Sequence, residues 1–167
     1  MFYTALGHRE DVWSDPRFQE HLMAGIEWAV AAPSESIPAP AGAQVLFDGT
    51  NLDGWKQKTD DQDARWKIED GAMVSSRSGD VVTRREYGGP FLLHVEFFVP
   101  ITPATNGWQD RGNSGVYVQG RYEVQVLDSY GLTLQAGDCG AIYGKHVPLV
   151  NASRPAGQWQ SYEIEFT

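Results

Sequence analysis

NSGVYVQGRYEVQVLDS, residues 113–129, holds two runs in which apolar and polar side chains alternate. The runs cover residues 116–119 and 122–128 on either side of a Gly-Arg pair, which is the pattern of a β-hairpin with one buried face. The apolar face is expected to consist of Val116, Val118, Tyr122, Val124 and Val126. The opposite face is expected to carry Tyr117, Gln119, Glu123 and Gln125. Because this second set holds the carboxylate and amide groups, we expect a site on that face.

The length of the hairpin loop follows from the same alternation. Residues directly opposite each other in an antiparallel pair lie on one face of the sheet. A two-residue loop would therefore place Val118 beside the carboxylate of Glu123. An odd loop, such as Gly120 to Tyr122, instead pairs Gln119 with Glu123 and Tyr117 with Gln125. This keeps the two sets of side chains apart, so the sequence predicts an odd loop.

The composition favours one all-β domain. The chain has 167 residues, which is enough for one well-buried domain. Its 18 glycines, 12% aromatic residues and short alternating runs are typical of a β-sandwich rather than of a helical protein. Cys139 is the only cysteine, so an intrachain disulfide is excluded and we expect a small buried apolar residue there.

The charge balance excludes two classes of partner. The sequence contains 13 Lys and Arg against 22 Asp and Glu, a formal net charge of -9, which would repel a phosphate backbone. It has no basic amphipathic patch, and no apolar run approaches the ~20 residues of a membrane span. We therefore expect neither nucleic acid nor a membrane as partner. The start of the chain has no basic leader with an apolar region, so no secretion signal is expected in it.

Short strands are expected throughout residues 44–167. A first strand is predicted at residues 45–47, a hairpin at 66–68 and 72–74, and further strands at 81–84, 91–99 and 161–166. In the longest of them the predicted inner face consists of Leu93, Val95, Phe97 and Val99. His94 and Glu96 lie on the other face, whose mixed character suits a sheet that lines a wet groove.

The beginning of the chain has a different pattern. Residues 2–6 predict a short strand, and residues 16–31 predict an amphipathic helix that ends before Pro33. A lone strand and helix cannot form a core, so we expect residues 1–32 to be the end of a larger unit. Residues 33–43 are rich in Ala, Pro and Ser, which is typical of a linker.

Four blocks of sequence carry a resemblance to a known family. They are VLFDGTNLDGW (45–55), the hairpin stretch, GAIYG (140–144) and PAGQWQSYEIEF (155–166). Together they resemble the 3-keto-disaccharide hydrolase domain family. This resemblance implies a mainly β fold, a concanavalin-like jelly-roll β-sandwich over residues 44–167 that lacks the family's last strands and is C-terminally incomplete.

A second resemblance concerns the N-terminal strand and helix. FYTALGHREDVWSDPRFQEHLMAGIEWA, residues 2–29, is similar to the C-terminal portion of a trehalose-utilisation (ThuA-like) domain, an α/β fold. The expected organisation is a ThuA-like remnant at residues 1–32, a linker at 33–43 and the β-sandwich at 44–167.

The first resemblance implies an enzyme, a hydrolase or lyase that cleaves 3-keto-glycosides such as 3-keto-disaccharides. A ketone at carbon 3 acidifies the hydrogen on carbon 2, so a base can remove that hydrogen while the aglycone leaves carbon 1, and water adds afterwards. This route needs a base, a group that stabilises the enolate and an acid, whereas an ordinary glycosidase needs two carboxylates astride the bond. The alternative from another class is a non-catalytic carbohydrate-binding module.

Three residues are candidates for the catalytic roles. Glu123 is the candidate base or metal ligand, and the alternative is a solvated strand residue. Asp128 is a second candidate, or else a turn-forming aspartate. His146 is the candidate acid or ligand. No cofactor is fixed by the sequence, and a divalent metal held by Glu123, Asp128 or His94 is conceivable.

A further set of side chains is expected to bind substrate, and each member has a structural alternative. Gln125 is expected to bond sugar hydroxyls, or else to be a polar outer residue. His94 and Glu96 contribute to a sugar or metal site, or else form a surface salt pair. The remaining candidates are Arg111 and Asn113 for substrate oxygens, and Tyr117, Tyr143 and Trp108 for stacking on a sugar ring. The resemblance implies a carbohydrate partner and an exported bacterial enzyme, periplasmic or extracellular, while the oligomeric state is not indicated.

Overall fold

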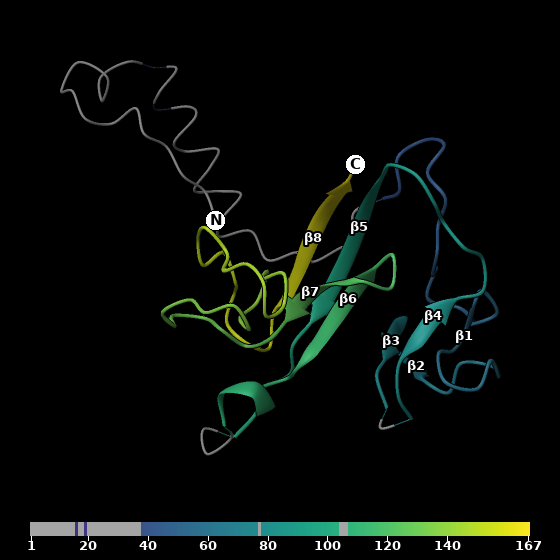
Figure 1. Cartoon of the computed structure of the whole chain (residues 1–167), viewed down its shortest axis with the longest axis horizontal. Helices are drawn as coiled ribbons and strands as arrows, with labels where there is room; N and C mark the ends of the chain where they lie inside the picture. The colour runs from purple at the N-terminus through teal and green to yellow at the C-terminus, as the bar shows by residue number, and fades with distance from the viewer. Residues whose placement is uncertain (1–15, 17–18, 20–37, 77, 104–106) are drawn as a thin grey trace. The chain divides into compact units, whose positions relative to one another are not determined.

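The computed structural model describes residues 16, 19, 38–76, 78–103 and 107–167 (Figure 1). The described part is mainly β, as expected, and its strands form four antiparallel two-stranded pairs. The strands are β1 (Trp55–Gln57), β2 (Lys67–Glu69), β3 (Ala72–Val74), β4 (Val81–Thr83), β5 (Phe91–Phe98), β6 (Ser114–Val118), β7 (Tyr122–Val126) and β8 (Trp159–Phe166). One short 3₁₀ helix, η1 (Trp108–Asp110), lies before β6.

The chain divides into two compact units, Ile37–Gly89 and a unit that contains Pro90–Thr167. In the first unit β1 pairs with β4, and β2 pairs with β3. Asp70 (φ 50) and Gly71 (φ 74) form the β2–β3 turn, and two positive φ angles are typical of the type I′ turn that an Asp-Gly pair favours. The predicted hairpin is therefore confirmed.

The prediction of a strand at residues 45–47 was wrong. These residues adopt no regular structure, and the backbone carbonyl of Leu46 accepts a hydrogen bond of 2.9 Å from the indole nitrogen of Trp55. Trp55 itself begins β1, a strand that the sequence pattern did not reveal. A hydrogen bond from an indole side chain to a backbone carbonyl produces no alternation of apolar and polar residues, so the sequence pattern could not show it.

β5 and β8 form the longest pair, with Phe91 opposite Phe166 at one end and Phe98 opposite Trp159 at the other. In Figure 1 these two strands run side by side. The rings of Phe97 and Tyr162 lie 4.5 Å apart between centroids, on the face predicted to be the inner one. Val99, just after β5, is buried, which agrees with that prediction.

The β6–β7 hairpin confirms the odd loop but not the predicted pairs. Tyr117 lies opposite Glu123, and Val118 lies opposite Tyr122. The loop is one residue earlier than expected, because Gln119 (φ 54) and Gly120 (φ 61) both adopt left-handed conformations and leave the ladder. The shift is two residues in register, so the apolar and polar sets still occupy separate faces.

Three contacts fix which face of the hairpin is interior. The Tyr162 hydroxyl donates a hydrogen bond to the backbone carbonyl of Gln125 and lies 3.1 Å from the Cys139 sulfur. The rings of Tyr122 and Phe166 lie 6.5 Å apart between centroids. The valine face of the hairpin therefore packs toward β5 and β8, and the face of Glu123 points away from them.

The expected N-terminal extension falls on residues that the structure does not describe. These are the strand at residues 2–6, the helix at 16–31 apart from residues 16 and 19, and the rest of the ThuA-like remnant at 1–32. Within the described ranges, no helix has both the length and the apolar character needed to cross a bilayer.

Candidate functional site

The side of the hairpin that points away from the interior is named here the carboxylate face. Its members, by strand alternation, are Asn113, Gly115, Tyr117, Glu123 and Gln125. The half-buried side chain of Glu123 lies over Gly115, and its Oε2 accepts a hydrogen bond of 2.9 Å from the Tyr117 hydroxyl. The predicted acid, phenol and amide thus share one face of adjacent strands.

Residues 140–143 extend this face on the other edge of β7. The backbone nitrogen of Gln125 donates to the carbonyl of Ala141 at 3.0 Å, and that of Tyr143 donates to the carbonyl of Glu123 at 2.9 Å. Val124 forms a bridge with Ile142, which places Tyr143 on the carboxylate face. Tyr117 (49% exposed) and Tyr143 (45% exposed) therefore flank Glu123.

Gln125 corrects one expectation, because it is fully buried rather than open to a groove. Its Nε2 donates to Asn113 Oδ1 at 3.2 Å, and Asn113 Nδ2 donates to two oxygens of Gln109 at 3.0 Å each. The Oε1 atom of Gln125 has no hydrogen-bond partner among the described residues. Because the side chain is buried, it is not open to a substrate in this arrangement.

Trp108 is held in place by a residue that the sequence pattern did not single out, Asp138. The indole nitrogen of Trp108 donates to Asp138 Oδ1 at 2.6 Å, and the ring packs against Gly137. Asp138 is fully buried and also accepts hydrogen bonds from the Gln135 backbone nitrogen at 2.6 Å and the Ser129 hydroxyl at 3.2 Å. Trp108 keeps 37% of its surface exposed, which leaves part of the ring available for stacking.

Arg111 and Asp128, predicted as a binding and a catalytic residue, contact each other. Arg111 Nη2 lies 2.7 Å from Asp128 Oδ2, and the Asp128 backbone nitrogen donates to the Arg111 carbonyl at 2.9 Å. Asp128 is only 8% exposed. This double link joins the chain before β6 to the chain after β7.

His146 is not brought to Glu123. It forms a backbone bridge with Ile142, which is itself opposite Val124 on the valine face. Residues opposite each other share a face, so His146 lies on the side away from the carboxylate of Glu123. Its side chain is exposed.

His94 and Glu96 are also separate from the carboxylate face. They lie on the side of β5 opposite to Phe97, and that side points away from the hairpin. His94 Nδ1 contacts Glu163, and its Nε2 lies 3.9 Å from Glu96 Oε1. The alternative of a surface salt pair fits this arrangement. Among the residues that the structure describes, no group of three or more His, Cys, Asp or Glu is placed to hold a metal.

Cys139 behaves as the small buried residue that was expected. Burial raises the pKa of its thiol, and the nearby Tyr162 hydroxyl partly opposes this by hydrogen bonding. Burial likewise raises the pKa of Tyr162. Both groups therefore stay neutral at physiological pH, which suits a packing contact rather than a nucleophile.

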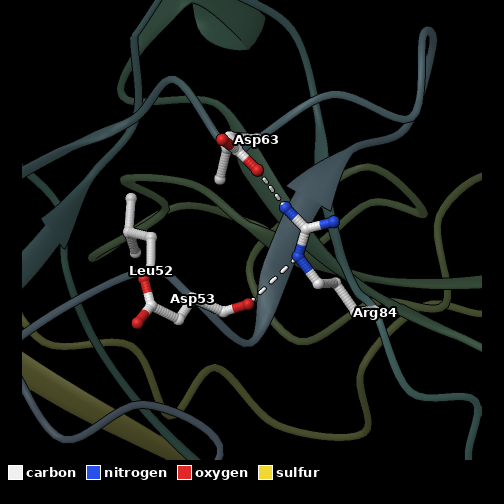
Figure 2. Close-up of a pocket in the computed structure, with 5 residues that line it drawn as sticks. Leu52, Asp53, Asp63 and Arg84 are labelled. Carbon is white, nitrogen blue, oxygen red and sulfur yellow. Dashed lines mark hydrogen bonds and ion pairs between the residues drawn. The ribbon is translucent and has the colours of Figure 1, made fainter.

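A pocket of about 370 Å³ lies in the other unit and is lined by none of the predicted site residues. Figure 2 shows Arg84 between the carboxylate of Asp63 and the backbone carbonyl of Asp53. Arg84 Nε donates to that carbonyl at 3.0 Å. Asp63 is almost completely exposed, so this pocket is an open, polar depression of the surface.

Comparisons with known proteins agree with the fold. Residues 42–167 match the family model of the 3-keto-alpha-glucoside-1,2-lyase-like domain. A crystal structure of a candidate glycosyl hydrolase from Parabacteroides distasonis is 40% identical with a TM-score of 0.67, covering 75% of this chain and 52% of its own. A second structure with that description, from the same organism, is 22% identical with a TM-score of 0.55 over 74% of this chain and 63% of its own, and supports the fold alone.

The expected β-sandwich class is confirmed by these neighbours. The chain spans about half the length of the first of them. No curated protein matches the chain.

Proposed function

The chain belongs to the family of 3-keto-alpha-glucoside-1,2-lyase-like domains, and from this membership we propose that it cleaves 3-keto-glycosides, 3-keto-disaccharides in particular. The coarser statement, a carbohydrate-acting domain of the glycosyl hydrolase kind, rests on the family and on the neighbour at 40% identity. The reaction, the substrate and the residues below are the proposal.

The proposed reaction is elimination followed by hydration. A base takes the hydrogen from carbon 2 as a proton, and the electron pair of that bond forms a double bond to carbon 1. The bond between carbon 1 and the aglycone oxygen breaks, and the aglycone leaves with a proton from an acid. Water then adds to carbon 1 while carbon 2 regains a proton, which gives the free 3-keto sugar.

Glu123 is proposed as the base, and the observation that carries this proposal is its position. The carboxylate lies over a glycine on a sheet face, between two half-exposed tyrosines, with one oxygen hydrogen-bonded to the Tyr117 hydroxyl. Such a carboxylate is fixed in direction by the Tyr117 hydroxyl, as a general base must be. The rings of Tyr117 and Tyr143 offer stacking surfaces to the sugar on either side of it.

The other predicted site residues differ in how well their positions fit the proposed reaction. Trp108 is proposed as a further stacking surface, and Asn113 as a group within reach of sugar hydroxyls. Gln125 would act mainly by orienting Asn113. Catalytic roles for Asp128 and His146 stay predictions, because Asp128 is bonded to Arg111 and His146 lies on the other face.

A carbohydrate-binding module remains the rival function, because exposed tyrosines and a tryptophan on a sandwich would also bind sugars without cutting them. One experiment separates the two. The protein is incubated with a 3-keto disaccharide and with the same disaccharide before oxidation, and free sugar is measured. The enzyme releases sugar from the keto form alone, since only its carbon-2 hydrogen is acidic. A module retains either ligand and releases nothing.

A further inference from the structure

We propose that Gly115 is a positioning residue for Glu123: the absence of a side chain at residue 115 creates the space in which the Glu123 side chain lies. This inference rests on the proposed function for its catalytic meaning. Its structural part, a dependence of the Glu123 side chain on a glycine across the hairpin, can be tested without any substrate.

Any residue other than glycine at position 115 would place its Cβ in steric conflict with the Glu123 side chain. A Cβ at residue 115 would lie 2.3 Å from Oε1 of Glu123, 2.6 Å from its Cγ and 2.9 Å from its Cδ. Non-bonded carbon atoms in proteins are separated by about 3.5–4.0 Å. Because Cγ is overlapped as well as the carboxylate oxygen, rotation of the carboxylate alone does not relieve the conflict. The whole side chain of Glu123 would have to leave the face of β6.

The backbone gives no other reason for a glycine at this place. Gly115 is not among the glycines with a positive φ angle, so an L-amino acid can adopt its conformation. It lies within β6, opposite Gln125, and glycine in a strand weakens the strand unless something must approach closely. Here the approaching group is the Glu123 side chain.

The neighbours of Glu123 explain why displacement would matter. The Glu123 side chain packs against Gly115, and its carboxylate accepts a hydrogen bond of 2.9 Å from the Tyr117 hydroxyl. A side chain at residue 115 would remove the packing contact and move the carboxylate away from the Tyr117 hydroxyl. A reacting group that is misplaced by about 1 Å loses up to roughly 10²-fold in rate.

The test is a double-mutant cycle with four proteins: wild type, Gly115→Ala, Glu123→Ala and the double variant. Each is unfolded in urea, and kcat and KM are measured on a 3-keto disaccharide. Gly88→Ala is the matched control, because a Cβ there meets no described atom within 4 Å and Gly88 has no positive φ. The urea midpoint falls in Gly115→Ala, but the same change in the Glu123→Ala background does not lower it. The kcat of Gly115→Ala falls by about tenfold or more with little change in KM, and Gly88→Ala keeps the wild-type values.

Equal loss of stability in both backgrounds would overturn the inference, as would a Gly115→Ala protein with wild-type kcat. If Gly115→Ala fails to fold, recovery of folding in the double variant supports the inference and failure of both contradicts it. Full turnover by Glu123→Ala would instead refute the proposed function, and the stability cycle would still report whether Gly115 sets the place of the side chain.

Discussion

Asp138 is a carboxylate with no exposed surface, and it is stabilised by three hydrogen bonds rather than by a cation. Its two oxygens accept bonds from Trp108, Ser129 and the Gln135 backbone nitrogen. A buried acceptor costs free energy unless it is paired, and these donors pair it. The carboxylate thereby joins η1 to the loop that precedes residues 140–143, and it orients the Trp108 ring.

Exchange of Asp138 for Asn is expected to lower the free energy of unfolding by about 1–3 kcal/mol, because the new amide group would meet a donor at Gln135 or at Trp108. Urea denaturation measures the loss. Glu165→Gln, at an exposed position of β8, serves as the control and should change stability by less than about 0.5 kcal/mol. A variant Asp138→Asn as stable as the wild type would show that these bonds contribute nothing net.

At the scale of single residues, alternation predicted the shared face of Tyr117, Glu123 and Gln125 correctly. It did not predict that Gln125 is buried, because its partner Asn113 lies before β6 and bonds to Gln109 in η1, a short 3₁₀ helix that leaves no periodicity in the sequence. Asp138 was missed for the same reason. A carboxylate in a glycine-containing loop looks like a solvated turn residue until its distant donors are known.

Gly120, in the loop between β6 and β7, has φ 61, and a Cβ there would meet no described atom within 4 Å. Any cost of a side chain is therefore backbone strain alone. We expect Gly120→Ala to destabilise the protein by about 1 kcal/mol, and Gly88→Ala, in open space with no positive φ, to be nearly neutral. Thermal or urea unfolding of the pair checks this, and equal effects would contradict the left-handed loop.

The contact between Cys139 and β8 predicts a dependence of stability on alkaline pH. Burial raises the pKa of Cys139 above its ordinary 9.0 and that of Tyr162 above its ordinary 10.0. The folded state thus holds these protons more tightly than the unfolded state, so the contribution is complete below about pH 9 and is lost as pH rises through the folded values. Urea unfolding between about pH 8 and pH 11 should show the decline.

Cys139→Ala is the variant for this test, because it removes the lower of the two unfolded-state pKa values. Its decline should begin at higher pH than that of the wild type, since Tyr162 alone then titrates. Identical profiles for the two proteins would show that ionisation of the thiol is not opposed by the fold.

At the scale of elements, long alternating runs were more informative than short ones. The β5 face and the odd hairpin loop were predicted because side-chain parity is preserved over many residues. The register was wrong by two, since nothing in the sequence showed that Gln119 would adopt a positive φ. The strand at residues 45–47 was wrong because a tryptophan side chain, not a strand, pairs with Leu46.

The arrangement of the whole Pro90–Thr167 unit separates two groups of polar residues that the sequence could not separate. His94 and Glu96 lie on the outer side of β5 and β8, and Glu123 lies on the outer side of the hairpin. His94 of β5 and Glu163 of β8 are 69 residues apart in the sequence. A local sequence pattern cannot predict a strand pairing over that separation. The two groups of polar residues therefore lie on opposite outer faces, with the apolar faces of the strands between them.

The double variant His94→Gln, Glu96→Gln is accordingly expected to retain turnover of a 3-keto disaccharide within about twofold, because both side chains lie on the outer side of β5, away from the proposed base Glu123. Initial rates at several substrate concentrations measure it. A loss comparable to that of a catalytic residue would place these side chains at the site and overturn their assignment to the opposite face.

The claim on which the whole account depends is that the carboxylate over Gly115 removes the carbon-2 proton. The direct measurement is aglycone release from a 3-keto disaccharide by Glu123→Gln, with Glu165→Gln as the matched control. Loss of the base predicts a rate lower by about 10²-fold or more in the first variant and wild-type release in the second. Undiminished release by a folded Glu123→Gln protein would contradict the account.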